Sequence, residues 1–141
     1  MYGCRPVFRF ISVSIVGGVT FGVLDGLLNA NPLAQHLYAF YKPVARPSVN
    51  VAAGIAIDLG YGFATAGVFL LLYKSLPGEA GWMKGLSYGL LVWFFRVVMG
   101  AAGQWVMFVV PPVTLVYSLA AGLLEMLVLG LFYGLALKPP T

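Results

Sequence analysis

The chain has 141 residues, of which 61% are hydrophobic and only 9% are charged, and its formal net charge is +4. A typical soluble domain carries roughly 25% charged residues, so this composition excludes an ordinary soluble protein and indicates a membrane protein with a single domain, residues 1–141. The eight basic residues are spread along the chain rather than clustered. We therefore expect them to lie beside lipid headgroups and expect no nucleic-acid partner.

Four apolar stretches are long enough to cross about 30 Å of hydrocarbon at about 1.5 Å per residue. Because lipid offers the backbone no hydrogen-bond partner, each stretch is expected to be a helix. The sequence thus predicts an all-α membrane protein, with four transmembrane helices in an antiparallel bundle. The spans lie near residues 8–29, 50–73, 84–108 and 113–137.

The connection between the first two spans contains the sequence NPLAQHLYAFYKP. Asn31 suits a helix N-cap, Pro32 suits the first helical position, and Pro43 is expected to end the helix. This pattern predicts a short amphipathic helix that lies in the interface of the first external loop, with Tyr38 and Tyr41 at headgroup level.

The distribution of basic residues predicts the orientation of the spans. With four crossings, five basic residues fall on one side of the membrane and two on the other. The larger group is Arg5, Arg9, Lys74, Lys84 and Lys138, and the smaller group is Lys42 and Arg46. Positive residues are enriched on the cytoplasmic side, so both termini are expected to be cytoplasmic, in a prokaryotic inner membrane.

Four ionisable residues lie inside the predicted spans: Asp25, Asp58, Arg96 and Glu125. A charge at the centre of a membrane costs at least about 2.5–3.5 kcal/mol, so such residues usually face the interior of a bundle and have partners. The set contains three acids and one base, so at least one of the acids is expected to be protonated unless another cation enters.

The third and fourth spans are joined by a tight turn, VVPPV, and must be neighbours. Arg96 and Glu125 lie at similar distances from this turn along the two helices, about 22 and 21 Å at 1.5 Å per residue. The two side chains can therefore meet at one level. A guanidinium–carboxylate contact is the leading explanation for an arginine within the apolar run LVWFFRVV.

Neutral polar residues and small residues follow the same helix faces. We expect a polar pathway lined by Asn29, Tyr61, Thr65, Tyr88 and Gln104. Small residues recur every four positions in several spans, as in Gly18-x3-Gly22 and Gly130-x3-Gly134, and in the row Ala52, Ala56, Gly60 and Ala64. Such spacing is typical of faces where helices pack closely.

No catalytic signature is present, so an enzymatic activity is not indicated. His36 is the sole histidine, and there is one cysteine, so paired haem ligands and a zinc or iron–sulfur cluster are excluded. No metal and no cofactor are expected. His36 itself fits either a solvated histidine at the membrane interface or a ligand or pH sensor.

The chain resembles small four-helix prokaryotic membrane proteins of uncharacterised function. The resemblance rests on the acid near the outer end of the first span, the aromatic external loop with its prolines, and the run GLLVWFF. It implies a fold but no activity. The chain is also similar in size to small multidrug exporters, which are organised around a glutamate in the first span. Here that span holds Asp25 instead, so their mechanism is not carried over.

Three functions remain open. The first is proton- or cation-linked transport or permeation of a small solute, by a homo-oligomer, with Asp58 and Glu125 as the key residues. The second is an accessory or assembly subunit of a larger membrane complex. The third is the binding of a lipid- or quinone-type amphipath between the helices. The excess of intramembrane acids favours the first, because a proton, a cation or a basic solute supplies the missing positive charge.

Overall fold

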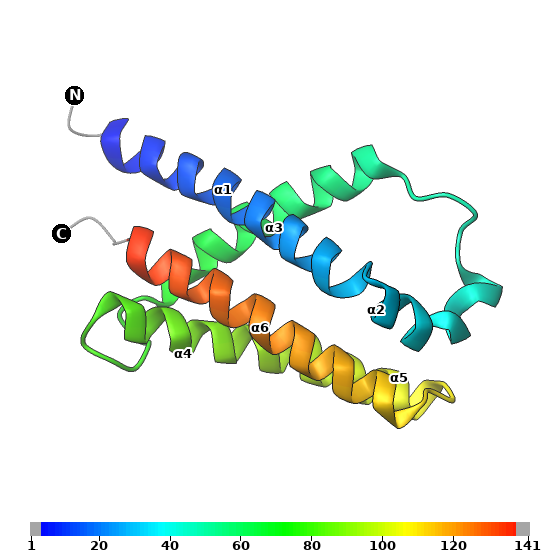
Figure 1. The fold of residues 1–141 in the computed structure, drawn as a ribbon. Coiled ribbons are helices and arrows are strands. Elements are labelled where there is room, and N and C mark those ends of the chain that lie inside the picture. Colours follow the sequence, from blue (N-terminus) through cyan, green and yellow to red (C-terminus); the bar gives the residue numbers. More distant parts are fainter. Residues whose placement is uncertain (1–3, 138–141) are drawn as a thin grey trace.

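The computed structural model describes residues 4–137, and all of its regular elements are helices (Figure 1). Four helical segments are long and apolar enough to cross a membrane, which indicates a membrane protein. They are α1 (Cys4–Asn29), α3 (Val51–Leu72), the run Gly81–Met107, and α6 (Pro112–Ala136). The four predicted spans are thus found within a few residues of their expected bounds. Many large apolar side chains on them are exposed, as surfaces that face lipid would be.

The third segment is interrupted by a π-helical turn. It consists of α4 (Gly81–Trp93), the π-helix η2 (Phe94–Val98) and α5 (Met99–Met107). The Met99 N–H donates to the Phe94 carbonyl, five residues earlier. Single π-turns inside α-helices occur frequently at functional sites, and this one carries Arg96. The sequence predicted a continuous helix here, so the turn is a local departure from that prediction.

The connection after α1 forms two short helices, α2 (Pro32–Leu37) and the 3-10 helix η1 (Ala39–Val44). Asn31 is the N-cap of α2, with its side chain accepting from the Ala34 N–H at 2.9 Å, and Pro32 is the first helical residue, as predicted. The prediction that Pro43 ends the helix is wrong, because Pro43 lies inside η1. The α-helix stops earlier, where the tyrosines that follow it turn towards α5 and α6.

The α4–α6 pair is held together by glycines that bring the two backbones into contact. Gly85 and Gly89 of α4 lie against Gly130 and Gly134 of α6. A Cβ atom on Gly130 would lie 2.9 Å from the Gly89 Cα, and one on Gly134 would lie 2.9 Å from the Gly85 Cα. Real side chains essentially never come this close, so this interface has no room for one. The glycine spacing read in α6 therefore reflects helix packing.

The α1–α3 pair crosses at Gly18 and Gly62 and diverges beyond them (Figure 1). A Cβ atom on Gly62 would lie 2.6 Å from the Gly18 backbone nitrogen. The predicted contact row of α3 was Ala52, Ala56, Gly60 and Ala64, and that prediction is wrong, because all four residues are exposed. The face that packs inward carries Gly62, Thr65, Ala66 and Phe69. The rotation of this helix therefore follows from the close contact at Gly62 and the packing of Phe69 in the core, and not from the predicted row.

Aromatic side chains fill the core where α3, α4 and α6 meet. The ring of Phe69 lies 5.2 Å from that of Tyr88 and 6.1 Å from that of Tyr133, measured between centroids. The Tyr133 hydroxyl donates to the Gly62 carbonyl at 2.8 Å and contacts the Thr65 hydroxyl at 2.8 Å. The buried phenol is therefore satisfied, and the core is closed around it.

Basic side chains cap two helix ends on one side of the molecule. Figure 1 shows the start of α1, the end of α6 and the 73–80 connection at this side, and α2, η1 and the 108–111 turn at the other. Arg9 Nε donates to the Ala136 carbonyl at 2.6 Å, and Lys84 Nζ donates to the Tyr73 and Leu76 carbonyls at 2.8 and 2.9 Å. The carbonyls at the ends of α6 and α3 thus gain cationic partners. Lys138 lies outside the described residues.

Candidate functional site

A polar cavity of about 250 Å³ lies between α1, the η2–α5 segment and α6. It is in the half of the molecule nearer to α2 and η1, away from the aromatic core. Residues of four segments line it: Asp25, Asn29, Tyr38, Arg96, Val97, Gly100, Ala101, Gln104, Ser118, Ala121, Gly122 and Glu125. Five of the nine residues that the sequence singled out are among them: Asp25, Asn29, Arg96, Gln104 and Glu125.

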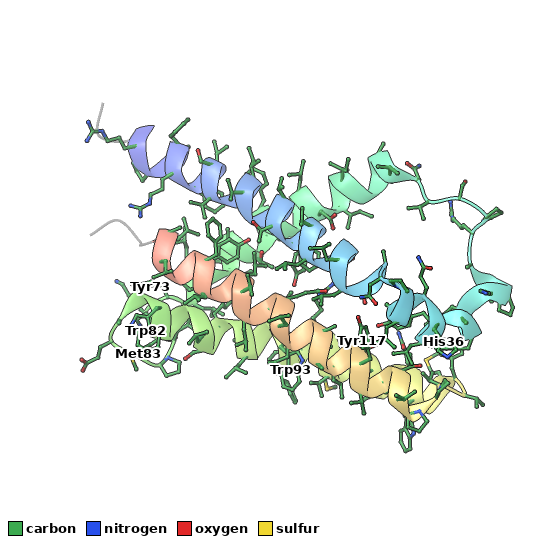
Figure 2. The ribbon with its side chains drawn as sticks, viewed as in Figure 1. His36, Tyr73, Trp82, Met83, Trp93 and Tyr117 are labelled. Carbon is green, nitrogen blue, oxygen red and sulfur yellow. The ribbon has the colours of Figure 1, made fainter. Side chains whose placement is uncertain are left out.

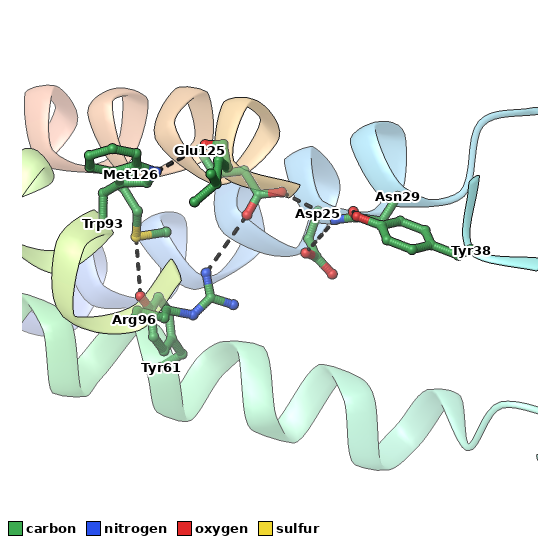
Figure 3. A network of polar contacts seen from close by, with 9 residues as sticks. Asp25, Asn29, Tyr38, Tyr61, Trp93, Arg96, Glu125 and Met126 are labelled. Atoms are coloured by element: carbon green, nitrogen blue, oxygen red, sulfur yellow. Dashed lines mark hydrogen bonds and ion pairs between the residues drawn. The ribbon is translucent and has the colours of Figure 1, made fainter. Parts of the chain in front are cut away.

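Asn29 is the centre of the hydrogen-bond network in this cavity (Figure 3). Its amide nitrogen donates to Asp25 Oδ1 at 2.9 Å and to Glu125 Oε1 at 3.3 Å. Its amide oxygen accepts from the Tyr38 hydroxyl at 3.2 Å. One neutral amide therefore bridges carboxyl groups from two helices. It holds both of them at the cavity without cancelling their charge.

Arg96 supplies the positive charge of the site. Its Nη1 lies 3.9 Å from Glu125 Oε2, and its guanidinium carbon lies 4.8 Å from the Phe21 ring centroid and 5.0 Å from that of Tyr61. The Arg96 side chain is 39% exposed, whereas the Glu125 side chain is 3% exposed. The structure thus brings the predicted partners together, but at the outer limit of an ion-pair distance. The rings of Phe21 and Tyr61 hold the cation beside the carboxylate.

The π-helical turn is held by two contacts with α6, one just before it and one within it. Before it, Trp93 Nε1 donates to the Leu119 carbonyl at 2.9 Å. Within it, Val97 lies against Gly122, where a Cβ atom would come within 2.6 Å of the Val97 side chain. Between these anchors the widened turn presents Arg96 at the cavity wall (Figure 3). The contacts that hold the π-helical turn against α6 therefore also place Arg96 at the cavity.

The loop after α1 closes one side of the cavity, which the sequence did not predict. The Tyr38 hydroxyl lies 2.9 Å from the Ser118 hydroxyl, and the Tyr41 hydroxyl donates to Gln104 Oε1 at 2.7 Å. Burial raises the pKa of Tyr38 above its usual value, so its phenol stays neutral and can donate. Tyr38 and Ser118 are the polar residues that the predicted site lacked. Tyr38 was expected to lie at headgroup level, and no spacing rule relates it to α6.

The other predicted site residues lie elsewhere. Asp58 lines a separate groove of about 370 Å³ at the α1–α3 crossing, next to Gly22. Tyr61, Thr65 and Tyr88 line an apolar groove between α3 and α4, and their hydroxyl groups point into the protein. The single polar seam that was expected is therefore divided. One part is a charged cavity, and the other is an apolar groove.

The cavity carries one more negative than positive formal charge, from Asp25, Glu125 and Arg96. Two carboxyl groups with neutral oxygen donors beside them can hold a proton or a small cation. In the part of the chain that the structure describes, no group of three or more histidine, cysteine or acidic residues could hold a metal ion. His36 is exposed on α2 (Figure 2), and it does not line the cavity.

Comparisons with known proteins give no match: no family model fits the sequence, and no curated protein or solved structure is similar to the chain. The function is therefore argued from the geometry of the cavity.

Proposed function

We propose that the four long helices cross a membrane as an antiparallel bundle, with α2 and η1 at its outer interface. The orientation puts both termini and the 73–80 connection in the cytoplasm of a prokaryotic cell. The support is the charge on the two sides. Arg5, Arg9, Lys74 and Lys84 belong to one side, whereas the other has Lys42 and Arg46.

Cysteine labelling in intact cells tests this orientation. In a variant with Cys4 replaced by serine, we expect Ser48→Cys to react with a membrane-impermeant maleimide and Ser75→Cys to remain unlabelled until the cells are opened. Both serines are exposed, and cysteine closely matches serine in size. Gly78 in the same connection is unsuitable, because its φ of 109° disfavours any side chain. The opposite labelling pattern would refute the orientation.

For the function, the observation that counts most is the excess negative charge of a cavity placed within the apolar spans. The chain binds a proton or small cation between Asp25 and Glu125 and carries it, or a basic solute, across the membrane. Charged groups inside a membrane are costly and are commonly kept for ion pathways and proton relays. The carboxyls are held by Asn29 rather than neutralised by it, so they remain available to a cation.

The cavity does not continue as an open pore in the described structure. The packed core of Phe69, Tyr88, Met126 and Tyr133 lies beyond it, with each of these side chains nearly fully buried. Transport therefore needs a rearrangement of helices, as in a carrier, rather than diffusion along a fixed channel. Four helices of this length enclose little volume, so we expect the carrier to be a homo-oligomer.

Flux into liposomes tests the proposal. Purified protein should give a proton or cation flux that Glu125→Gln and Asp25→Asn reduce severalfold, because each removes a negative charge from the cavity. Glu79→Gln is the control, because Glu79 is an exposed acid of the 73–80 connection that does not line the cavity, and it should keep most of the flux. Unfolding in detergent should show that all variants are folded. Equal flux in wild type and all variants would refute transport through these carboxyl groups, and no flux across a pH series would refute transport.

A second candidate function is that of an accessory subunit in a larger membrane complex. The observation that favours it is Asp58, a partly exposed carboxyl at an outer groove with no ion pair among the described residues. A partner helix with a basic residue would complement it. Native mass spectrometry of gently solubilised protein distinguishes a foreign subunit from self-association, and loss of the foreign subunit in Asp58→Asn would support this alternative.

A further inference from the structure

One side of the polar cavity is covered by residues 38–44, which are Tyr38 and η1 and which we call the tyrosine segment. The core that contains Tyr88 and Tyr133 closes the cavity towards the start of α1 and the end of α6. Where Arg96 is exposed, the cavity faces lipid in the proposed bundle, and hydrocarbon excludes charged solutes. A charged solute from the outer solution would therefore have to pass the tyrosine segment.

The tyrosine segment is held to the cavity wall by the hydroxyl groups of two tyrosines. The Tyr38 hydroxyl lies 2.9 Å from the Ser118 hydroxyl and donates to the Asn29 amide oxygen at 3.2 Å. The Tyr41 hydroxyl donates to Gln104 Oε1 at 2.7 Å. All three partners line the cavity. Because water or a polar solute can take the place of a tyrosine hydroxyl, each of these hydrogen bonds adds little net free energy to the closed arrangement.

Few apolar contacts add to these hydrogen bonds. No residue of η1 is buried, and Val44 at its end is 80% exposed. The Tyr41 ring packs against the rings of Phe40 and Tyr38, with centroids 4.0 and 6.2 Å away, and both of these neighbours belong to the tyrosine segment itself. Segments with few buried apolar residues open locally at a low cost in free energy, and the moving covers of binding sites are typically such segments.

The preceding helix, α2, is fixed to the bundle. Ala34 is fully buried. The buried Thr114 hydroxyl donates to the Leu37 carbonyl at 2.8 Å, which ties the last residue of α2 to α6. The Asn31 amide nitrogen donates to the Tyr117 hydroxyl at 2.9 Å, which ties the other end of α2 to the same helix. The backbone is therefore anchored as far as Leu37, and the tyrosine segment begins at the next residue.

We propose that the tyrosine segment is the outer gate of the polar cavity and that it opens by turning away from the cavity about the end of α2. This inference rests on the proposed transport function and states how the outer solution reaches its site. In the open arrangement Ser118 and Gln104 exchange the tyrosine hydroxyls for water or for an entering cation. In the closed arrangement Tyr38 and Tyr41 return to these partners and cover the carboxyl groups.

The rate at which a cysteine in the cavity reacts measures the gate. Ala101→Cys in a Cys4→Ser background is the reporter, because Ala101 lines the cavity and is half-buried. The probe is MTSET, a permanently cationic thiol reagent, applied to purified protein in detergent micelles. Tyr41→Phe should speed the reaction about two- to tenfold, the factor that corresponds to one hydrogen bond, because it removes the hydroxyl and keeps the ring. Adding Tyr38→Phe should speed it further.

Tyr73→Phe is the matched control, since Tyr73 is an equally half-buried tyrosine that does not line the cavity. It should leave the rate at Ala101→Cys unchanged. A second reporter, Ser75→Cys in the exposed 73–80 connection, should react equally fast with and without Tyr41→Phe, which separates opening of the gate from a general loosening of the fold.

Equal rates at Ala101→Cys with and without the two tyrosine hydroxyls would overturn the gate. So would a rate at Ala101→Cys that already equals the rate at Ser75→Cys while both tyrosines are present, because the cavity would then be open with the segment in place. Liposome flux separates this inference from the proposed function. Flux with unchanged cysteine rates refutes the gate alone, whereas the expected rates without any flux support the gate and refute transport.

Discussion

In Gly130→Val, the α4–α6 pair should unfold at a far lower denaturant concentration than in the wild type. The free energy of unfolding should fall by about 3 kcal/mol or more. A Cβ atom at this position would lie 2.9 Å from both the Cα and the nitrogen of Gly89, and closer still to the Gly85 carbonyl. Backbone atoms cannot move aside as a flexible side chain can, so the helices must separate. Overpacking of well-packed cores typically costs about 1–3 kcal/mol, and this contact is at the severe end.

Unfolding of the purified protein in mixed micelles of rising SDS content measures this loss. Gly103→Val is the matched control, because nothing lies within 4 Å of a Cβ atom at Gly103 in α5. It should change stability by less than about 0.5 kcal/mol, since valine is a slightly better helix former than glycine. A graded series, with Gly130→Ala between wild type and Gly130→Val, would support a steric cause. Similar effects at Gly130 and Gly103 would contradict it.

The spans could be predicted from the sequence because the physical constraint on them is simple. Apolar runs of this length in lipid have to be helices, and the bounds of α1, α3 and α6 follow from where those runs stop. The N-cap at Asn31 was predictable for a similar reason, since capping is a local interaction. The π-turn at Phe94–Val98 was not, because it depends on how α4 fits onto α6 at Trp93 and Val97.

The candidate site was predictable where residues share a helix or a short hairpin. Asp25 and Asn29 are one helical turn apart in α1. Arg96 and Glu125 lie at similar distances on either side of the 108–111 connection. The rotation of α3 about its axis was not predictable, because the small residues that recur every four positions from Ala52 to Ala64 are exposed. Asp58 consequently faces a groove of its own instead of the cavity. Tyr38 was missed because its role depends on the path of a loop, which no periodicity encodes.

Arg96→Ala should destabilise the protein by about 3 kcal/mol. Glu125 is nearly fully buried, and removing one partner of a buried ion pair leaves the other charge without compensation, which typically costs about 3–5 kcal/mol. We take the lower end of this range, because Asn29 still donates to the Glu125 carboxyl at 3.3 Å and part of the charge remains solvated by that amide. The contacts of Arg96 with the Phe21 and Tyr61 rings are lost as well.

Glu125→Gln added to Arg96→Ala should recover at least about 1 kcal/mol of that loss, because the double variant no longer buries an uncompensated charge. The same SDS titration, run on wild type, both single variants and the double variant, gives the coupling energy. Arg96→Ala combined with Arg9→Gln is the control cycle. Arg9 caps α6 at the opposite end and shares no partner with Arg96, so those two effects should add. If the Arg96 and Glu125 effects also simply add, the 3.9 Å contact carries no energy. Arg96 would then be held by the two rings alone.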